Sequence, residues 1–416
     1  MRFSTEIRSG EFPAVFQRFE EVIGRTLWHR RAVKIRDDIR GNPYLRECLL
    51  DANGIAFVLD AYSTLKKTSG ALPLVQIQDA QQYEAVNFVT QTIAFLDSVD
   101  ARIAKAFRGR VQGAFANPRD FRGLALEMLT ATHMQRRGST IRLPQDGTYD
   151  WLAEREGLEF EVECKSISGD KGRQIHLRES LDLCHLVKKE VGNLVDSVAD
   201  GLLVIVRPPG KAPKAHQHQR DIAKLAMQAV LMAQDVSSDL ASVTQTHFPK
   251  NQLVLTGQGS DREHLESFLK QRYGAVHGYQ AVAHATRAGG RFLVAIGSQT
   301  PDDMIGETMR TLQRAALDQL TGKRPGILCV KLEGLTADEL VEIGQTGEPP
   351  TALRIGVHNL WQSRAMDRVS HVVFMADGRV EQKASGAWSR LGATYLFDNP
   401  KSPFKDEPRL QLFSDS

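Results

Sequence analysis

The sequence predicts an α/β protein with a mixed sheet flanked by helices, and three observations support this fold class. The N-terminal residues, 1 to about 110, carry apolar residues at helical spacing. The run Leu202-Leu203-Val204-Ile205-Val206 is entirely apolar, as in a strand that is buried on both faces. From Pro208 onward, strand signals and helix signals alternate along the chain.

The N-terminal region is expected to be a helical scaffold. Phe12-Pro13 predicts the start of the first helix, because proline is tolerated in a first turn. A second helix is expected around 55–62, and the residues 70–73 interrupt the pattern. One long amphipathic helix is predicted from about Gln81 to Phe107. This region has no chemical motif, so partner binding, dimerisation and DNA contact all stay open.

Composition excludes several classes of protein. The 416 residues are 42% hydrophobic and 25% charged, which is typical of a soluble globular protein of two or three domains. No apolar run is long enough to span a membrane, and the N-terminus lacks the apolar segment of a secretion signal. The four cysteines have no paired spacing, so neither a disulfide framework nor a zinc site is indicated. We therefore expect a cytoplasmic protein with no membrane partner.

The net charge of +3 is small, but its distribution is uneven. From Ala101 to Arg142 there are nine basic residues and only two acidic ones, a local charge of +7. A basic segment directly before an acidic hairpin suits an enzyme that binds a phosphate backbone. The alternative is an arginine-rich helical linker that is only solvated.

A hairpin is predicted from Thr148 to Ser166, with Glu156-Gly157 as its turn. In its second strand, one face carries apolar residues and the other carries charged ones. The apolar face comprises Leu158, Phe160, Val162 and Cys164, and the charged face comprises Glu159, Glu161, Glu163 and Lys165.

The register of this hairpin brings two carboxylates together. If the loop has two residues, paired positions sum to 313, so Asp150 lies opposite Glu163 and on its face. Lys165 shares that face, two residues further on. Two carboxylates repel unless a cation lies between them, and oxygen ligands suit a hard ion such as Mg²⁺. The alternative is a solvated strand face, which the neighbouring Glu159 and Glu161 favour. In the metal-site interpretation, these two glutamates are flanking charge.

The flanking elements add one more candidate. Asp120 could cap a helix from Phe121 to Arg137 that ends before Gly138, and its buried stripe includes Leu124 and Met128. Glu127 is the only acidic residue between Asp120 and Asp146. After the hairpin, a polar loop and Gln174 lead into a helix that runs to about Ala199 and stops at Gly201.

Further elements are predicted along the second half of the chain. Thr300-Pro301-Asp302-Asp303 predicts the start of a helix running to Leu320. The other predicted helices are 222–233 and 264–269, and the predicted strands are 252–255, 291–296, 326–330 and 371–375, followed by short antiparallel β-structure from Arg379 to Asp398.

The order of these elements resembles the PD-(D/E)xK, restriction-endonuclease-like nuclease superfamily. The resemblance covers roughly residues 115–207 and rests on Glu127, Asp150 and the run Glu163-Cys164-Lys165, with Tyr149 where that family often has proline. It implies a restriction-endonuclease-like mixed central sheet. We expect three regions: a helical N-terminal region (1–110), a nuclease core (111–207) and a C-terminal α/β extension packed on the core (208–416). A separate C-terminal domain is the alternative, and extension is favoured because no clear linker follows Val206.

The resemblance also implies a role for each residue. Asp150, Glu163 and the Cys164 backbone carbonyl would bind Mg²⁺, with Mn²⁺ able to substitute, and Lys165 would position or activate the attacking water. Glu127 would bind the same metal through water or hold a second one. Gln174, just after the site on the next helix, would contact the phosphate or order Lys165. Four cations are expected to hold the nucleic-acid backbone, namely Lys171, Arg173, Arg119 and Arg122.

These inferences lead to one functional hypothesis and two alternatives. The hypothesis is a Mg²⁺-dependent endonuclease that hydrolyses DNA, in a restriction or phage-defence setting that rests on the family resemblance alone. DNA is the expected partner, together with a second copy of the chain or accessory defence subunits. The alternatives are an inactive nuclease-fold subunit that binds nucleic acid or scaffolds a complex, and a nuclease of RNA.

Overall fold

The computed structural model describes residues 10–73, 77–144, 146–253, 264–265, 267–269, 271, 280–344, 351–382 and 388–413. The chain folds into two compact units. Unit 1 contains Met1–Ile35, Leu50–Lys171 and Ile305–Ser416, and unit 2 contains Arg36–Leu49 and Gly172–Met304. This division differs from the three consecutive segments expected from the sequence, because a middle segment forms its own core and the chain then returns to the first unit.

The N-terminal region is helical, as predicted. Its helices are α1 (Phe12–Phe19), α2 (Thr26–Gly41), α3 (Arg46–Ser69), α4 (Ala80–Ser98), α5 (Ala101–Ala116) and α6 (Pro118–Arg136). A short π-helix at Glu20–Gly24 and a 3₁₀ turn at Pro43–Leu45 lie between them. The single long helix expected from Gln81 is two helices. The Asp100 side chain accepts hydrogen bonds from the backbone N–H groups of Arg102 and Ile103, and this cap begins α5.

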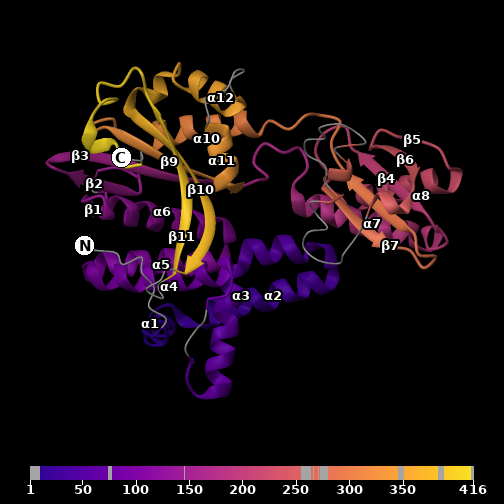
Figure 1. Cartoon of the computed structure of the whole chain (residues 1–416), viewed down its shortest axis with the longest axis horizontal. Helices are drawn as coiled ribbons and strands as arrows, with labels where there is room; N and C mark the ends of the chain where they lie inside the picture. Colours follow the sequence, from indigo (N-terminus) through magenta and orange to yellow (C-terminus); the bar gives the residue numbers. More distant parts are fainter. Residues whose placement is uncertain are drawn as a thin grey trace. The chain divides into compact units, whose positions relative to one another are not determined.

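Unit 1 is built around a six-stranded mixed sheet in the order β1-β2-β3-β9-β10-β11 (Figure 1). Strands β3 and β9 pair in parallel, as do β9 and β10, and the remaining pairs are antiparallel. The strands are β1 (Thr140–Arg142), β2 (Trp151–Arg155), β3 (Leu158–Ile167), β9 (Gly326–Thr336), β10 (Val369–Gln382) and β11 (Trp388–Asp398). The predicted C-terminal strands therefore extend the sheet of the hairpin.

Each face of this sheet packs against a different set of helices (Figure 1). One face presents Phe160, Val162 and Cys164 to the core formed with α1 and α3–α6. The other presents Leu328 and Val330 to the core formed with helices from the C-terminal part, α10 (Met304–Asp318), α11 (Ala337–Gly344) and α12 (Ala352–Leu360). The predicted alternation of the apolar residues in β3 is thus confirmed.

Unit 2 has a second sheet, in the order β5-β6-β4-β8-β7. Its elements are α7 (Leu177–Val195), β4 (Gly201–Arg207), α8 (His216–Met232), β5 (Val236–Ser237), β6 (Ser242–Phe248), β7 (Gln280–Ala285) and β8 (Arg291–Ile296). The apolar run Leu202–Val206 is a buried central strand, as expected. It belongs to this second sheet, however, so the expectation of one central sheet containing both the hairpin and this strand is wrong.

Several predicted boundaries shift. Helix α6 begins at Pro118, so Asp120 lies inside it and is not its cap, while Gly138 follows it with the expected positive φ of 87°. Helix α10 begins at Met304, four residues after Thr300, whose hydroxyl donates instead to the Pro209 carbonyl oxygen.

Other predicted elements fall partly outside the described residues. Lys250–Gln252 form a 3₁₀ turn where a strand was expected to start, and Val254 and Leu255 are not among the described residues. The described residues of 264–269 are helical. Over the described part of the chain, no helix combines the length and the apolar character needed to cross a membrane.

The hairpin has the predicted register. Trp151 pairs with Val162 and Arg155 pairs with Leu158, so paired positions sum to 313. Glu156 (φ 52°) and Gly157 (φ 80°) both have positive φ, as a two-residue type I′ turn requires. Glu156 is one of the two non-glycine residues with positive φ among the described residues, which is a strained choice for a glutamate.

The turn offers a direct test of this strain. Replacing Glu156 with Asn (Glu156→Asn) should raise the free energy of unfolding by about 0.5–1 kcal/mol, because asparagine adopts positive φ at lower cost. Denaturant unfolding monitored by circular dichroism measures the change. The matched variant Gly157→Ala should lower stability by a similar amount, since its φ also lies in the left-handed region. Destabilisation by Glu156→Asn would contradict the turn assignment.

Candidate metal-binding and catalytic site

The candidate site lies where β3 runs past the end of β2. The ladder between the two strands ends at the pair Trp151–Val162, while β3 continues to Ile167, where β9 is its strand partner among the described residues. The carboxylates of Glu127, Asp150 and Glu163 and the ammonium group of Lys165 interact electrostatically here.

The Asp150 side chain supplies a hydrogen-bond acceptor just beyond the point where the backbone ladder between β2 and β3 ends. It lies in a bend just before β2, and its own backbone N–H donates to the Val162 carbonyl oxygen at 3.1 Å. Its Oδ2 accepts a hydrogen bond from the backbone N–H of Cys164 at 2.8 Å. A side-chain carboxylate therefore occupies the position of a missing strand partner, and this fixes Asp150 beside the residues Glu163 to Lys165.

Glu163 and Lys165 form an ion pair on the charged face of β3. The distance from Glu163 Oε1 to Lys165 Nζ is 2.5 Å, with the Glu163 side chain 1% exposed and the Lys165 side chain 24% exposed. The second oxygen, Glu163 Oε2, is buried and has no hydrogen-bond partner among the described residues. A buried carboxylate oxygen without a partner is costly unless a cation or a donor reaches it.

Glu127 comes from α6 and is held from two sides. Its backbone carbonyl oxygen accepts a hydrogen bond from Trp151 Nε1 at 3.0 Å, which ties α6 to the first residue of β2. Arg110 Nη2, from α5, lies 2.6 Å from both carboxylate oxygens of Glu127. Glu127 is only 7% exposed, so this glutamate is a buried partner of an arginine and not a surface residue.

Burial raises the pKa of all three carboxyl groups, and repulsion from Asp150 adds to the shift for Glu127 and Glu163. For Glu163, burial is the largest cause and Asp150 the next, and together they raise the pKa to about 8 even though Lys165 lies beside it. Burial and Asp150 also raise the pKa of Glu127, to about 7, although Arg110 opposes the shift. Burial raises the pKa of Asp150, while the Cys164 N–H and Lys165 oppose that shift. The site thus favours a state with fewer than three negative charges.

The three carboxylates suit a hard divalent cation, but Arg110 and Lys165 already form ion pairs with two of them. Three carboxylates and an unpartnered buried oxygen are the ligands that Mg²⁺ prefers. Within the described residues, however, no group of three or more His, Cys, Asp or Glu side chains has the spacing to hold a metal ion. Arg110 is paired with Glu127 and Lys165 is paired with Glu163, so two of the three carboxylates already have a cation partner.

The other predicted site residues are distributed between the two units. Cys164 lies in the site and pairs in register with Cys329 of β9. Lys171 ends a segment of unit 1, and its backbone N–H donates to the Ser168 carbonyl oxygen. Gln174 and Arg173 belong to unit 2.

Gln174 was expected at the start of the next helix, and this expectation is wrong. Helix α7 begins at Leu177, so Gln174 lies in the preceding loop. Its backbone N–H donates to Asp302 Oδ1 at 2.8 Å, and its side-chain Nε2 donates to the Pro301 carbonyl oxygen at 3.3 Å. Its described contacts thus hold the loop within unit 2.

The two remaining predicted DNA contacts come from the start of α6. Arg122 is ion-paired with Asp51 (3.2 Å) and lies 3.9 Å from Glu333 Oε2 on β9. The side chain of Arg119 is outside the described residues.

Two important residues were not identified from the sequence. Arg110 was one of nine cations in a basic segment, and nothing in its spacing distinguished it as the partner of Glu127. Glu161 was interpreted as flanking charge, but it is fully buried and its carboxylate accepts a hydrogen bond from the Thr321 backbone N–H at 2.7 Å. Arg324 Nη1 lies 3.5 Å from it, so Glu161 anchors the loop before β9.

Comparison with known proteins adds no assignment. No protein-family model, no curated protein and no solved structure matches this chain.

The raised pKa of Glu163 predicts a pH-dependent stability. Because the folded-state pKa (about 8) exceeds the ordinary value of 4.5, the stabilisation from the protonated form is complete below about pH 4.5 and is lost as the pH rises to about 8. In EDTA, Glu163→Gln should therefore melt about 5 °C above the unmodified protein near pH 9 and close to it near pH 5.

Thermal unfolding across this pH range measures the effect. Glu159→Gln is the matched control, because Glu159 shares the strand face of Glu163 but is half-exposed and ion-paired with Arg142 and Arg324. The difference in melting temperature between Glu159→Gln and the unmodified protein should not increase with pH. A Glu163→Gln protein that melts below the unmodified protein at high pH would contradict the burial argument.

Proposed function

We propose that this protein is a divalent-metal-dependent endonuclease that hydrolyses phosphodiester bonds in DNA. The observation that carries the proposal is the convergence of Asp150, Glu163 and Lys165 at the unpaired end of β3, with Glu127 brought to them by α6. Three carboxylates and a lysine beside an open strand edge form a set that can bind a cation and orient a water.

Each residue has a distinct role in this proposal. Asp150 and Glu163 would hold the cation, and Glu163 Oε2 is the oxygen without a partner among the described residues. A bound Mg²⁺ would supply charge stabilisation at the scissile phosphate and lower the pKa of a bound water. Lys165, on the partly exposed side of the pair, would orient the attacking water or hold a phosphate oxygen. Glu127 would complete the set once it is released from Arg110.

The strand connections support the resemblance to restriction-endonuclease-like nucleases in a modified form. Helix α6, the strands β1, β2 and β3, helix α10 and the parallel strand β9 follow one another in unit 1. Residues 172–304, which form most of unit 2, are inserted between β3 and α10. We propose that α10 and β9 are the helix and strand that follow the Glu-x-Lys run in this fold, in place of α7 and β4.

The surface of α5 supports a nucleic-acid substrate. Arg102, Lys105 and Arg108 are exposed on this helix, which also carries Arg110. A row of exposed cations on the helix that contacts the site would attract a phosphate backbone. A role in restriction or phage defence, and assembly with a second copy or with defence subunits, stay predictions.

The ion pair between Arg110 and Glu127 favours a second candidate, a nuclease-fold module that binds nucleic acid without cleaving it. A carboxylate that is already hydrogen-bonded to a cation does not need a metal ion, and both Glu127 oxygens accept hydrogen bonds from Arg110. An active enzyme would have to exchange this pair for a metal contact. The two functions differ in one observable, which is cleavage in the presence of Mg²⁺.

Cleavage assays test the first proposal. Supercoiled plasmid, linear duplex, single-stranded DNA and RNA would be incubated with Mg²⁺, Mn²⁺ or EDTA. We expect metal-dependent cleavage of DNA, and a loss of roughly 100-fold or more in Asp150→Ala and in Lys165→Ala. Glu159→Ala, on the same strand face, should cleave like the unmodified protein.

Three outcomes would overturn or redirect the assignment. Cleavage in EDTA, or full activity in both site variants, would falsify it. Cleavage of RNA alone would change the substrate class. Intact substrates under every condition, together with retention of DNA in a mobility-shift assay, would support the binding module.

The proposed competition between Arg110 and Mg²⁺ for the Glu127 carboxylate gives an independent prediction. Arg110→Met should tighten Mg²⁺ binding by roughly tenfold, because it removes a cation 2.6 Å from both oxygens of a candidate ligand. Calorimetric titration near pH 8.5 and again near pH 9.5 measures this affinity, because the loss of Arg110 raises the pKa of Glu127 above its value of about 7 in the unmodified protein. Arg108→Met, an exposed cation on the same helix, is the control. Weaker Mg²⁺ binding in Arg110→Met would contradict the competition.

A further inference from the structure

Unit 1 contains a cavity of about 620 Å³ that is separate from the carboxylate site. It is lined mainly by residues of α3, α4 and α6 and by residues from the middle of β9, β10 and β11. Its lining includes none of Glu127, Asp150 and Glu163. Its volume falls within the range of small-molecule sites, which is about 300–1,000 Å³. The proposed nuclease activity makes no use of this cavity.

Helix α4 contributes a row of polar residues to the lining of the cavity. Glu84, Asn87 and Gln91 follow one another at helical spacing in this row, where a scaffold helix would carry apolar residues. Asn87 Oδ1 is buried and has no hydrogen-bond partner among the described residues. Gln91 is only 2% exposed, and its Nε2 donates to Thr132 Oγ1 at 3.3 Å. Asn87 belongs to the lining of the cavity, and its buried amide oxygen lacks a donor that a ligand N–H group would supply.

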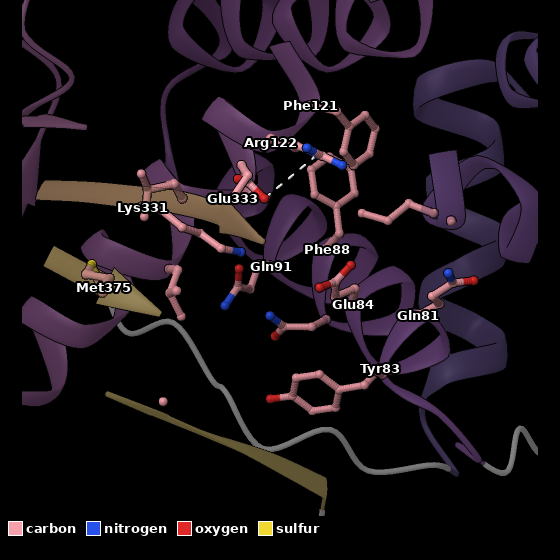
Figure 2. Close-up of a pocket in the computed structure, with 18 of the residues that line it drawn as sticks. Gln81, Tyr83, Glu84, Phe88, Gln91, Phe121, Arg122, Lys331, Glu333 and Met375 are labelled. Atoms are coloured by element: carbon pink, nitrogen blue, oxygen red, sulfur yellow. Dashed lines mark ion pairs between the residues drawn. The ribbon is translucent and has the colours of Figure 1, made fainter. Parts of the chain in front are cut away.

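Aromatic side chains form part of the same wall. Tyr83 and Phe88 come from α4 and Phe121 from α6, and all three line the cavity (Figure 2). The rings of Phe88 and Phe121 are in contact, with centroids 4.3 Å apart. Flat apolar surfaces next to amide groups are the usual surroundings of a planar heteroaromatic ring, which needs stacking on its faces and hydrogen bonds at its edge.

The charge of the lining favours an anionic ligand. Five cations and three acids line the cavity within the described part of the chain, a net charge of +2 with His133 neutral. Figure 2 shows Lys331 extending from its strand toward Gln91, and Arg122 joined to Glu333 by an ion pair. The cations are Arg31, Arg122, Arg136, Arg137 and Lys331, and the acids are Asp51, Glu84 and Glu333. A phosphate monoester, with about two negative charges at neutral pH, matches this balance.

We propose that this cavity binds a nucleoside monophosphate. The base lies against the aromatic side chains and donates an N–H group to Asn87 Oδ1, and the phosphate lies near Lys331 and Arg122. The ligand is either a free nucleotide or the terminal nucleotide of a strand, because the two present the same chemistry. The proposal does not depend on cleavage at the carboxylate site.

Thermal shift and calorimetric titration in EDTA test this proposal. The probes are the four nucleoside 5′-monophosphates, the matching nucleosides and inorganic phosphate, each at up to about 5 mM. At least one monophosphate should raise the melting temperature and bind about tenfold or more tightly than its nucleoside or phosphate alone. Asn87→Leu and Lys331→Met should each weaken it by about tenfold or more.

Matched variants separate binding from folding. Asn193→Leu and Lys189→Met change exposed residues of the same types and should bind like the unmodified protein. Asp150→Ala should also keep full nucleotide affinity, which separates this site from the proposed nuclease site. Circular dichroism and the ligand-free melting temperature check the fold of each variant.

A second arm distinguishes the source of the ligand. Oligonucleotides with a 5′-phosphate or a 5′-hydroxyl, carrying 2-aminopurine at the end, report insertion of a terminal base by a change in fluorescence. Binding of the free nucleotide, of the phosphorylated end, or of both supports the proposal. Binding of neither, or binding that Asn87→Leu and Lys331→Met leave unchanged, overturns it.

Discussion

The hydrogen bond from the Cys164 backbone N–H to Asp150 is the contact on which the candidate site depends. A continued β2 strand would have satisfied this N–H with a backbone carbonyl and covered the edge of β3. Instead the ladder stops at Trp151, and a carboxylate takes the place of the backbone acceptor. Asp150 is thereby fixed next to Glu163 and Lys165, and the end of β3 stays open on one side. Because a backbone N–H must be satisfied, the position of Asp150 is determined by the sheet itself.

Three partly or fully buried carboxyl groups in one place require compensation, and the chain supplies it with two cations and with protons. Lys165 pairs with Glu163, and Arg110 pairs with Glu127. These pairs do not fully offset burial, since the pKa of each carboxyl group stays above its ordinary value. The site therefore retains an affinity for positive charge. A proton and the two side-chain cations compete for the same oxygens, and in the proposed function a metal ion would compete with them.

Helix α6 connects this site to the nucleotide-sized cavity. It is buried on several sides, because it lies between the sheet and the N-terminal helices. Glu127 serves the carboxylate cluster, while Arg122 and Thr132 of the same helix line the cavity. A second connection runs through β9, where Glu333 accepts a hydrogen bond from Ser166 at 2.6 Å and lies beside Arg122. Ser166 directly follows Lys165, so the two sites share both a helix and a strand pair.

The sequence alone determined the hairpin, its two-residue turn and its register, because the period of two and the Glu-Gly turn are local properties. It also determined the helical N-terminus and the buried strand Leu202–Val206. The tertiary structure decided which strands are neighbours: β3 pairs with β9, more than 150 residues away, and not with β4. No local pattern encodes such a pairing, since a long insertion leaves both strands unchanged. The same holds for Arg110, Glu161 and Gln174, whose roles depend on side chains brought near them only by the fold.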